Sequence, residues 1–229
     1  MARSAGASRV GVITGLRAEA RCLAGLDVLV ACSGARPERA RAEAARLIAE
    51  GVEALASFGL AGGLAPTLAA GDLVLAAAVA LPGGGRVATD AAWRGRLAGL
   101  LGGTRRFEET LAGSDRLVAS PALKAVLHAT REAIAVDMES HAVAEAAAAA
   151  GLPFLVIRAI ADPSDRALPP VAQKALGPDG ALRPAALAGG LLRRPQDLAA
   201  LLRLGQDSAR GLGTLRRVAA LAAPDLALR

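Results

Sequence analysis

The sequence predicts an α/β protein, with one domain over residues 1–229 and helices on both faces of a central, mixed, largely parallel and twisted sheet. Three observations support this three-layer fold class. Short apolar runs of strand length alternate with longer segments of helical periodicity. A chain of 229 residues suits one such domain. Its 53% hydrophobic residues allow a large core and exclude disorder, and the 2% of aromatic residues make that core aliphatic.

Local signals predict the individual elements. Val10–Thr14 is a β-branched run that ends at Gly15, as expected for a buried strand. Pro37–Glu50 has a proline in its first turn, one apolar face, and Gly51 after its end, which together predict a helix. The other predicted strands are Asp27–Cys32, Ala54–Phe58, Asp72–Ala80, Arg106–Leu111, Ala133–Val136 and Phe154–Ile160. The other predicted helices are Arg17–Ala24, Ala91–Leu101, Pro121–Thr130, Glu139–Ala150 and Asp197–Ala222.

Two segments have special composition. Gly59–Gly63 is rich in glycine and predicts a tight turn whose backbone can approach a ligand closely. Pro163–Arg194 contains repeated prolines and predicts loops. We expect residues 163–229, a proline-rich loop followed by a leucine-rich helix, to pack on the domain as a tail.

Composition also excludes several classes of function. The formal net charge is +6, but the arginines are scattered and few aromatic residues lie among them, so no nucleic-acid partner is expected. Cys22 and Cys32 are too few for a disulfide framework or a metal cluster, and we expect no metal site. Ala54–Gly71 is uncharged, but its glycines and proline indicate buried sheet and not a membrane span. The expected location is the cytoplasm or, peripherally, its membrane.

Two carboxylates follow apolar strands and carry most of the functional information. Glu139 lies in Val136-Asp137-Met138-Glu139, and Asp162 ends Arg158-Ala159-Ile160-Ala161-Asp162. Ligands of open α/β sheets bind at the carboxyl ends of strands, so we expect the two acids to face one ligand from adjacent strand tips. There one acid can hold a sugar diol while the other protonates a departing base. The residues alone also allow plainer roles: a helix N-cap for Asp162, a first-turn acid for Glu139, and core packing for Met138.

Five separated motifs together resemble the nucleoside phosphorylase and nucleosidase superfamily, over about two thirds of the chain. They are Gly11–Gly15 with Glu19, Ser33-Gly34, Gly59–Pro66 with Gly71-Asp72, Val136–Glu139, and Arg158–Asp162. In length and in its tail the chain is similar to the hopanoid-associated phosphorylases. That branch is thought to remove adenine from adenosylhopane, a polycyclic lipid joined to a nucleoside.

The resemblance implies a role for each motif. Asp162 would donate a proton to the leaving purine, and Glu19 would orient an attacking water. Glu139 and Met138 would bind the ribose and favour an oxocarbenium-like transition state. The expected base-binding residues are Leu117, Val118 and Asp115. The expected residues of the phosphate or nucleophile site are Arg17, Ser33, Gly34, Gly59 and Ala61.

One departure from the family pattern concerns the nucleophile. Many phosphorylases of the superfamily carry an arginine two residues before the first glycine of the third motif and a serine directly after it. This chain has Ser57 and Leu60 there. The sequence therefore leaves open whether phosphate or water attacks, and we expect no cofactor other than phosphate as a possible co-substrate.

Three functions are compatible with these motifs. The first is cleavage of the N-glycosidic bond of adenosylhopane, with transient membrane contact through the lipid-linked substrate. The second is hydrolysis of a small thio-nucleoside such as methylthioadenosine. The third is a non-catalytic protein that binds a nucleoside or lipid on the same fold, which the presence of Glu19, Glu139 and Asp162 together disfavours. The resemblance also implies a homo-oligomer.

Overall fold

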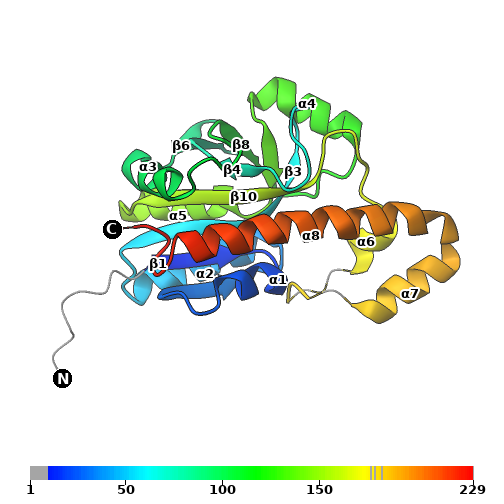
Figure 1. Ribbon diagram of the computed structural model, residues 1–229, viewed down its shortest axis with the longest axis horizontal. Coiled ribbons are helices and arrows are strands. Elements are labelled where there is room, and N and C mark those ends of the chain that lie inside the picture. Colours follow the sequence, from blue (N-terminus) through cyan, green and yellow to red (C-terminus); the bar gives the residue numbers. More distant parts are fainter. Residues whose placement is uncertain (1–9, 176, 178, 182, 229) are drawn as a thin grey trace.

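The computed structural model describes residues 10–175, 177, 179–181 and 183–228, and within these residues a mixed sheet lies between two layers of helices (Figure 1). Its strands are β1 (Val10–Thr14), β2 (Val28–Cys32), β3 (Ala54–Gly63), β4 (Leu73–Leu75), β5 (Ala78–Ala80), β6 (Arg86–Ala88), β7 (Arg106–Phe107), β8 (Thr110–Gly113), β9 (Ala135–Asp137) and β10 (Phe154–Asp162). They follow the order β6-β5-β8-β9-β3-β10-β4-β7, and β1 joins β3 to β2. Among the described residues six of the nine strand pairings are parallel, which confirms the predicted mixed, largely parallel sheet.

Helices cover both faces of this sheet. They are α1 (Arg17–Ala20), α2 (Pro37–Ala49), α3 (Ala91–Leu100), α4 (Pro121–Arg131), α5 (Ser140–Ala150), α6 (Pro170–Ala175), α7 (Pro184–Arg193) and α8 (Leu198–Leu221), with short 3-10 turns η1 (Arg21–Leu23) and η2 (Pro195–Asp197). One face packs against α3, η1 and the carboxyl half of α8, and the other against α2 and α5. Figure 1 shows α8 running along the sheet, with α6, α7 and the first turns of α8 beyond the sheet's end.

The strand β10 lies in the middle of this arrangement and is buried on both faces. Its side chains alternate: Leu155 and Ile157 enter the core on the α8 face, while Val156 and Ile160 enter the core on the α5 face. Arg158 has the same parity as Val156, so its guanidinium lies on the α5 face, where it is completely buried. A buried cation therefore lies beneath the start of α5.

The predicted turn at Gly59–Gly63 is wrong, because β3 continues through these residues as one strand. It continues because β10 runs parallel beside it, with Gly59 opposite Arg158 and Gly62 opposite Asp162. The glycines serve close packing within the sheet: a Cβ on Gly59 would lie 2.5 Å from Nη1 of Arg158. Glycine here makes room for a buried arginine and does not form a loop.

Other boundaries also differ from the prediction. Asp72–Ala80 divides into β4 and β5, because β4 pairs with β10 and β5 pairs with β8. Arg106–Leu111 likewise contains β7 and the start of β8, and the edge strand β6 was not predicted. The segment predicted as loops, Pro163–Arg194, contains the helices α6 and α7. Among the described residues no helix is both long enough and apolar enough to span a membrane.

Candidate active site

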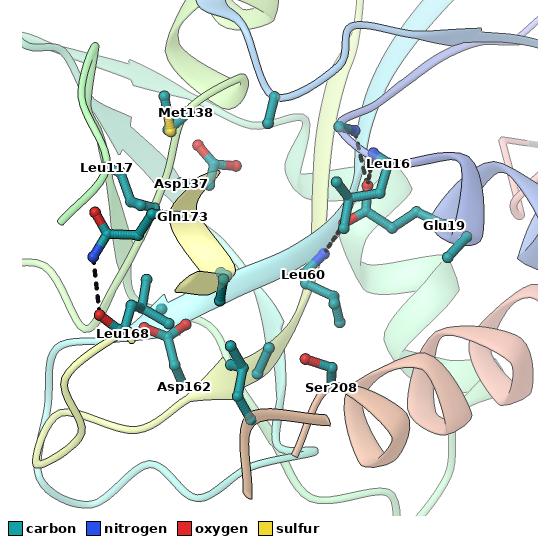
Figure 2. A pocket seen from close by; sticks show the side chains of 18 of the residues that line it. Leu16, Glu19, Leu60, Leu117, Asp137, Met138, Asp162, Leu168, Gln173 and Ser208 are labelled. Atoms are coloured by element: carbon teal, nitrogen blue, oxygen red, sulfur yellow. Dashed lines mark hydrogen bonds between the residues drawn. The ribbon is translucent and has the colours of Figure 1, made fainter. Parts of the chain in front are cut away.

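The end of the sheet beside α8 holds a cavity of about 600 Å³ that brings the three predicted acids together. Glu19, Glu139 and Asp162 all line it. Figure 2 shows Asp162 and Glu19 on different sides of the cavity, with Met138 near Asp137 on a third side. The expected adjacency of two strand tips is wrong in detail, because β3 lies between β9 and β10 and is antiparallel to β9. The shared cavity exists nonetheless.

Asp162 is the last residue of β10 and is held by a lysine from another part of the chain. Nζ of Lys124, in α4, lies 2.7 Å from Oδ2 of Asp162, and the lysine side chain is completely buried. The same ammonium donates to the carbonyl oxygens of Asp162, Pro163 and Arg166 at 3.0, 2.8 and 3.1 Å. Lys124 thus fixes both the carboxylate and the loop that follows it.

The protonation of Asp162 depends on two opposing effects. Burial raises the pKa of this carboxyl above its ordinary value, while the charge and hydrogen bond of Lys124 lower it. The net direction is upward. Because no described residue donates a hydrogen bond to Oδ1, that oxygen is left to meet a ligand across the cavity.

Glu19 is held by the backbone. Its Oε2 accepts the N–H groups of Gly15 and Leu16 at 2.8 and 2.7 Å, and its Oε1 accepts the N–H of Leu60 at 2.8 Å. The side chain is buried, and burial raises its pKa against the opposing effects of Arg158 and these three donors. Its orientation is therefore set by the turn between β1 and α1 together with β3, and a spare lone pair on Oε1 is available to a water.

Glu139 lies at the N-terminus of α5 and pairs with Arg158. Nη2 of the arginine lies 3.2 Å from Oε2 of Glu139. Oε1 lies next to Gly15, where a Cβ would come within 2.7 Å of it. Glycine at this position therefore allows the carboxylate to reach the cavity wall, and no described residue donates a hydrogen bond to Oε1.

Arg158 also contacts other buried polar groups. Its Nε lies 2.6 Å from Oδ2 of Asp137, and its Nη2 donates to Oγ of Ser57 at 2.5 Å. Ser140 Oγ lies 3.0 Å from Ser57 Oγ and bonds to Asp137. The arginine is thus surrounded by the carboxylates of Asp137 and Glu139 and the hydroxyls of two serines.

More carboxylates than cations are buried at this end of the cavity, and the pKa of Glu139 reflects the imbalance. Burial, together with the negative charges of Asp137 and Glu19, raises the pKa of Glu139 from 4.5 to about 8, although Arg158 opposes the shift. Glu139 therefore carries a proton near neutral pH in the absence of a cation in the cavity. A positively charged sugar beside it would favour the carboxylate form.

The remaining wall of the cavity is apolar. It comes from the segment after β10, including α6, and from α7 and α8. It consists mainly of leucines and alanines, and Gln173 and Ser208 are polar residues within it. The Gln173 amide donates to the Leu168 carbonyl at 2.9 Å, and Figure 2 shows this pair beside Asp162. The leucines of this wall are Leu168, Leu187, Leu201, Leu204 and Leu212.

Comparison with known proteins assigns the family. The sequence matches the phosphorylase superfamily over residues 10–192, which is most of the chain. This chain belongs to the phosphorylase superfamily. The family assignment agrees with the sequence motifs, and the protein is an enzyme of the N-glycosyl bond-cleaving type. No curated relative matches the chain at a significant level.

Solved structures of superfamily enzymes share the fold. A 5'-methylthioadenosine/S-adenosylhomocysteine nucleosidase of Helicobacter pylori has a TM-score of 0.68 and 17% identity, covering 93% of this chain and 98% of its own. Futalosine hydrolase of the same organism has a TM-score of 0.67 and 16% identity, covering 92% and 97%. An S-adenosylhomocysteine nucleosidase of Streptococcus pyogenes has a TM-score of 0.69 and 19% identity, covering 97% and 100%. At these identities the likeness concerns the fold.

Of the residues predicted to bind ribose and base in this superfamily member, some line the cavity and one does not. Met138, Leu117 and Val118 line the cavity. Asp115 does not line it, because its exposed carboxylate turns toward His141 and lies 3.1 Å from Nε2 of that ring. Leu117 is 45% exposed, so the cavity remains open on its side.

Most residues predicted for the phosphate or nucleophile site do not line the cavity themselves. Ala61 lines it, whereas Arg17, Ser33, Gly34 and Gly59 do not. The guanidinium of Arg17 lies at the surface, 2.9 Å from a carboxylate oxygen of Asp179. Ser33 is completely buried, and Gly59 packs against Glu19 and Arg158. One of the five residues predicted for this site therefore lines the cavity, and the role of the other four stays a prediction.

Sequence reasoning missed Arg158 and Lys124 as site residues. A single arginine inside the apolar run of β10 was a usable signal, because an unpaired charge in a buried strand is costly and implies partners. Lys124 gave no comparable signal, since its partner lies 38 residues away in the sequence. Among the described residues no group of three or more His, Cys, Asp and Glu side chains is placed to hold a metal ion.

Proposed function

We propose that this enzyme cleaves the N-glycosidic bond of a purine nucleoside and releases adenine, with adenosylhopane as the preferred substrate. The observation that carries the proposal is one cavity that combines three buried carboxylates with an aliphatic wall. The acids provide the chemistry of glycosidic cleavage. The aliphatic wall provides room for a hydrocarbon substituent on the sugar.

In this proposal Asp162 is the general acid. Burial favours the protonated form of its carboxyl by raising the pKa, and Lys124 occupies Oδ2, so that Oδ1 is the oxygen placed to donate to N7 of the purine. A protonated purine leaves as a neutral base, and positioned general acids contribute about 10²–10⁴-fold in rate. The free oxygen and the fixed carboxylate support this assignment.

Glu139 and Glu19 act on the sugar and the nucleophile. Glu139 accepts hydrogen bonds from the ribose hydroxyls through Oε1, and its negative form stabilises positive charge on the sugar. Glu19 accepts a proton from the attacking water through Oε1. The surface position of Arg17 supports water over phosphate as the nucleophile, because it removes the expected cationic ligand from the cavity.

The aliphatic wall supports a lipid substituent. Five leucines and neighbouring alanines line the side of the cavity that α7 and α8 cover. Burial of about 400 Å² of hydrocarbon would contribute roughly 10 kcal/mol gross at about 25 cal/mol per Å², before the cost of ordering the ligand. A small methylthio group would leave most of this surface uncovered.

Adenine release from two substrates tests the proposal. We expect turnover of adenosylhopane with a higher kcat/KM than that of methylthioadenosine, and no 1-phosphate of the released, 5'-substituted ribose when phosphate is added. Leu201→Ser and Leu204→Ser together should raise KM for the lipid substrate more than for the small one, because these leucines line the wall.

The same assay separates the alternatives. Rapid turnover of methylthioadenosine alone would replace the lipid substrate with a small thio-nucleoside. Formation of a phosphorylated sugar would make phosphate the nucleophile. Binding of a nucleoside without adenine release from either substrate would reject the catalytic proposal altogether.

A further inference from the structure

The helices that cover the aliphatic wall also present leucines to solvent. No residue of α7 is buried, although its sequence is mostly apolar. Leu192, at the end of α7, is 86% exposed, and Leu198 and Leu202, in the first turns of α8, are 48% and 60% exposed. Figure 1 shows this part of the molecule beyond the end of the sheet. We call the exposed surface of residues 184–206 the hairpin surface.

The hairpin surface is basic as well as apolar. Between residues 184 and 206 it contains Arg193, Arg194 and Arg203, while the acid in this range, Asp197, is buried and pairs with Arg194 at 3.2 Å. A second cavity of about 470 Å³, between α6 and α7, is lined by Lys174, Arg193 and Arg194. Three cations around one hollow are complementary to phosphate groups.

The outward and inward leucines lie on different faces of the same helices. Leu198 and Leu202 are four residues apart and share an outer face of α8, while Leu201 and Leu204 line the cavity. In α7, Leu187 lines the cavity and Leu192 faces solvent. The hairpin surface is therefore separated from the substrate cavity by the thickness of one helix layer.

We propose that the hairpin surface docks on a lipid bilayer containing anionic phospholipids, with the leucines in the acyl region and the basic cavity on the headgroup phosphates. Exposed leucines flanked by arginines are the features of helices that lie in a membrane interface. A second copy presenting this same surface is poorly complementary in charge, because the surface carries arginines while the acid of residues 184–206, Asp197, is buried and paired with Arg194. This inference rests on the proposed function in one respect: docking on the bilayer would bring the enzyme to a lipid-linked nucleoside.

Flotation with vesicles tests the proposal on the full chain without substrate. Vesicles of phosphatidylcholine mixed with phosphatidylglycerol should bind the protein, and phosphatidylcholine alone should bind it more weakly. The variant Leu192→Ser/Leu198→Ser/Leu202→Ser should lose at least ~10-fold in partition. Arg193→Gln/Arg203→Gln should lose about fivefold per arginine on anionic vesicles and little on neutral ones.

A matched control comes from another exposed apolar pair. Leu123 and Val126, in α4, are 55% and 57% exposed, and Leu123→Ser/Val126→Ser should leave vesicle binding unchanged. All variants change exposed side chains, so thermal unfolding should stay close to that of the parent. Absence of vesicle binding by the parent, or equal loss in the α4 control, would overturn the proposal.

Two further outcomes are informative. If the triple leucine variant changes the oligomeric state in solution while vesicle binding persists, the surface is an interface between copies and the proposal is wrong. Vesicle binding needs no turnover, so the proposed function and the docking surface fail separately. Binding without adenine release rejects the proposed function, and adenine release without binding rejects the docking surface.

Discussion

The two acidic ends of the cavity differ in how their negative charge is balanced. At one end Asp162 pairs one to one with Lys124, whose ammonium also holds three backbone carbonyls. At the other end the carboxylates of Glu139 and its neighbours share the single guanidinium of Arg158. The first arrangement fixes the geometry of an acid, whereas the second raises the pKa of Glu139, whose carboxylate form a cationic sugar would favour. Proton donation and sugar stabilisation thus use different electrostatic designs within one cavity.

The largest expected effect comes from removing the shared cation. Arg158→Met leaves Asp137 and Glu139 buried without their partner, and we expect the free energy of unfolding to fall by about 3–5 kcal/mol in urea titrations. Arg41→Met is the matched control, because its ion pair with Glu145 is exposed and is expected to contribute less than about 1 kcal/mol. Equal losses in the two variants would show that the buried cluster does not depend on Arg158.

The next effect concerns Asp162, at the end of the cavity where it pairs with Lys124. Asp162→Asn keeps the shape of the side chain but removes its acid, so kcat should fall at least ~10²-fold while a non-reactive nucleoside analogue still binds. Initial rates of adenine release and titration with the analogue measure both quantities. Unchanged turnover would remove Asp162 from the chemistry.

Replacing the lysine should produce a smaller and different change. Lys124→Met removes the charge that lowers the pKa of Asp162, so the alkaline limb of kcat should move to higher pH. Loss of orientation should also reduce kcat by roughly 10–10²-fold. The exposed Lys174 provides the control: Lys174→Met should leave the pH profile of a water-soluble substrate where it was. A profile that does not move in Lys124→Met would indicate a purely structural lysine.

The last effect is a dependence of stability on pH that comes from Glu139, at the end of the cavity where Arg158 is shared, and it is small over any single pH unit. Folding raises the pKa of Glu139 from 4.5 to about 8, so between these values the native chain binds more protons than the unfolded chain. Its contribution to stability is complete below pH 4.5 and is lost as pH rises through about 8, with a slope of up to ~1.4 kcal/mol per pH unit.

Urea titrations from about pH 5 to pH 8 measure that slope. Glu139→Gln should flatten it, and some slope should remain because Glu19 and Asp162 also have raised pKa values. The exposed Glu145 offers a control, and Glu145→Gln should leave the slope unchanged. A slope that is the same in Glu139→Gln and the parent would mean that another group carries the proton.

Local sequence signals determined most of the alternating strands and helices up to β10, the helix α8 and the position of the principal acids. The β-branched run of β1, the helix α2 with a proline in its first turn, and the apolar run of β10 are each set by propensity and periodicity within one segment. For the same reason Glu139 and Asp162 could be placed near the ends of strands from their motifs alone. These features depend on neighbours a few residues away, which a single sequence contains.

Tertiary structure decided which side chains meet. The pair of Lys124 with Asp162, the burial of Arg158 among acids, and the turning of Arg17 to the surface all join segments distant in sequence. The strand through Gly59–Gly63 and the aliphatic wall from α7 and α8 likewise exist because other elements lie beside them. Long-range pairing and burial set these features, and local propensity carries no information about a partner that only folding brings near.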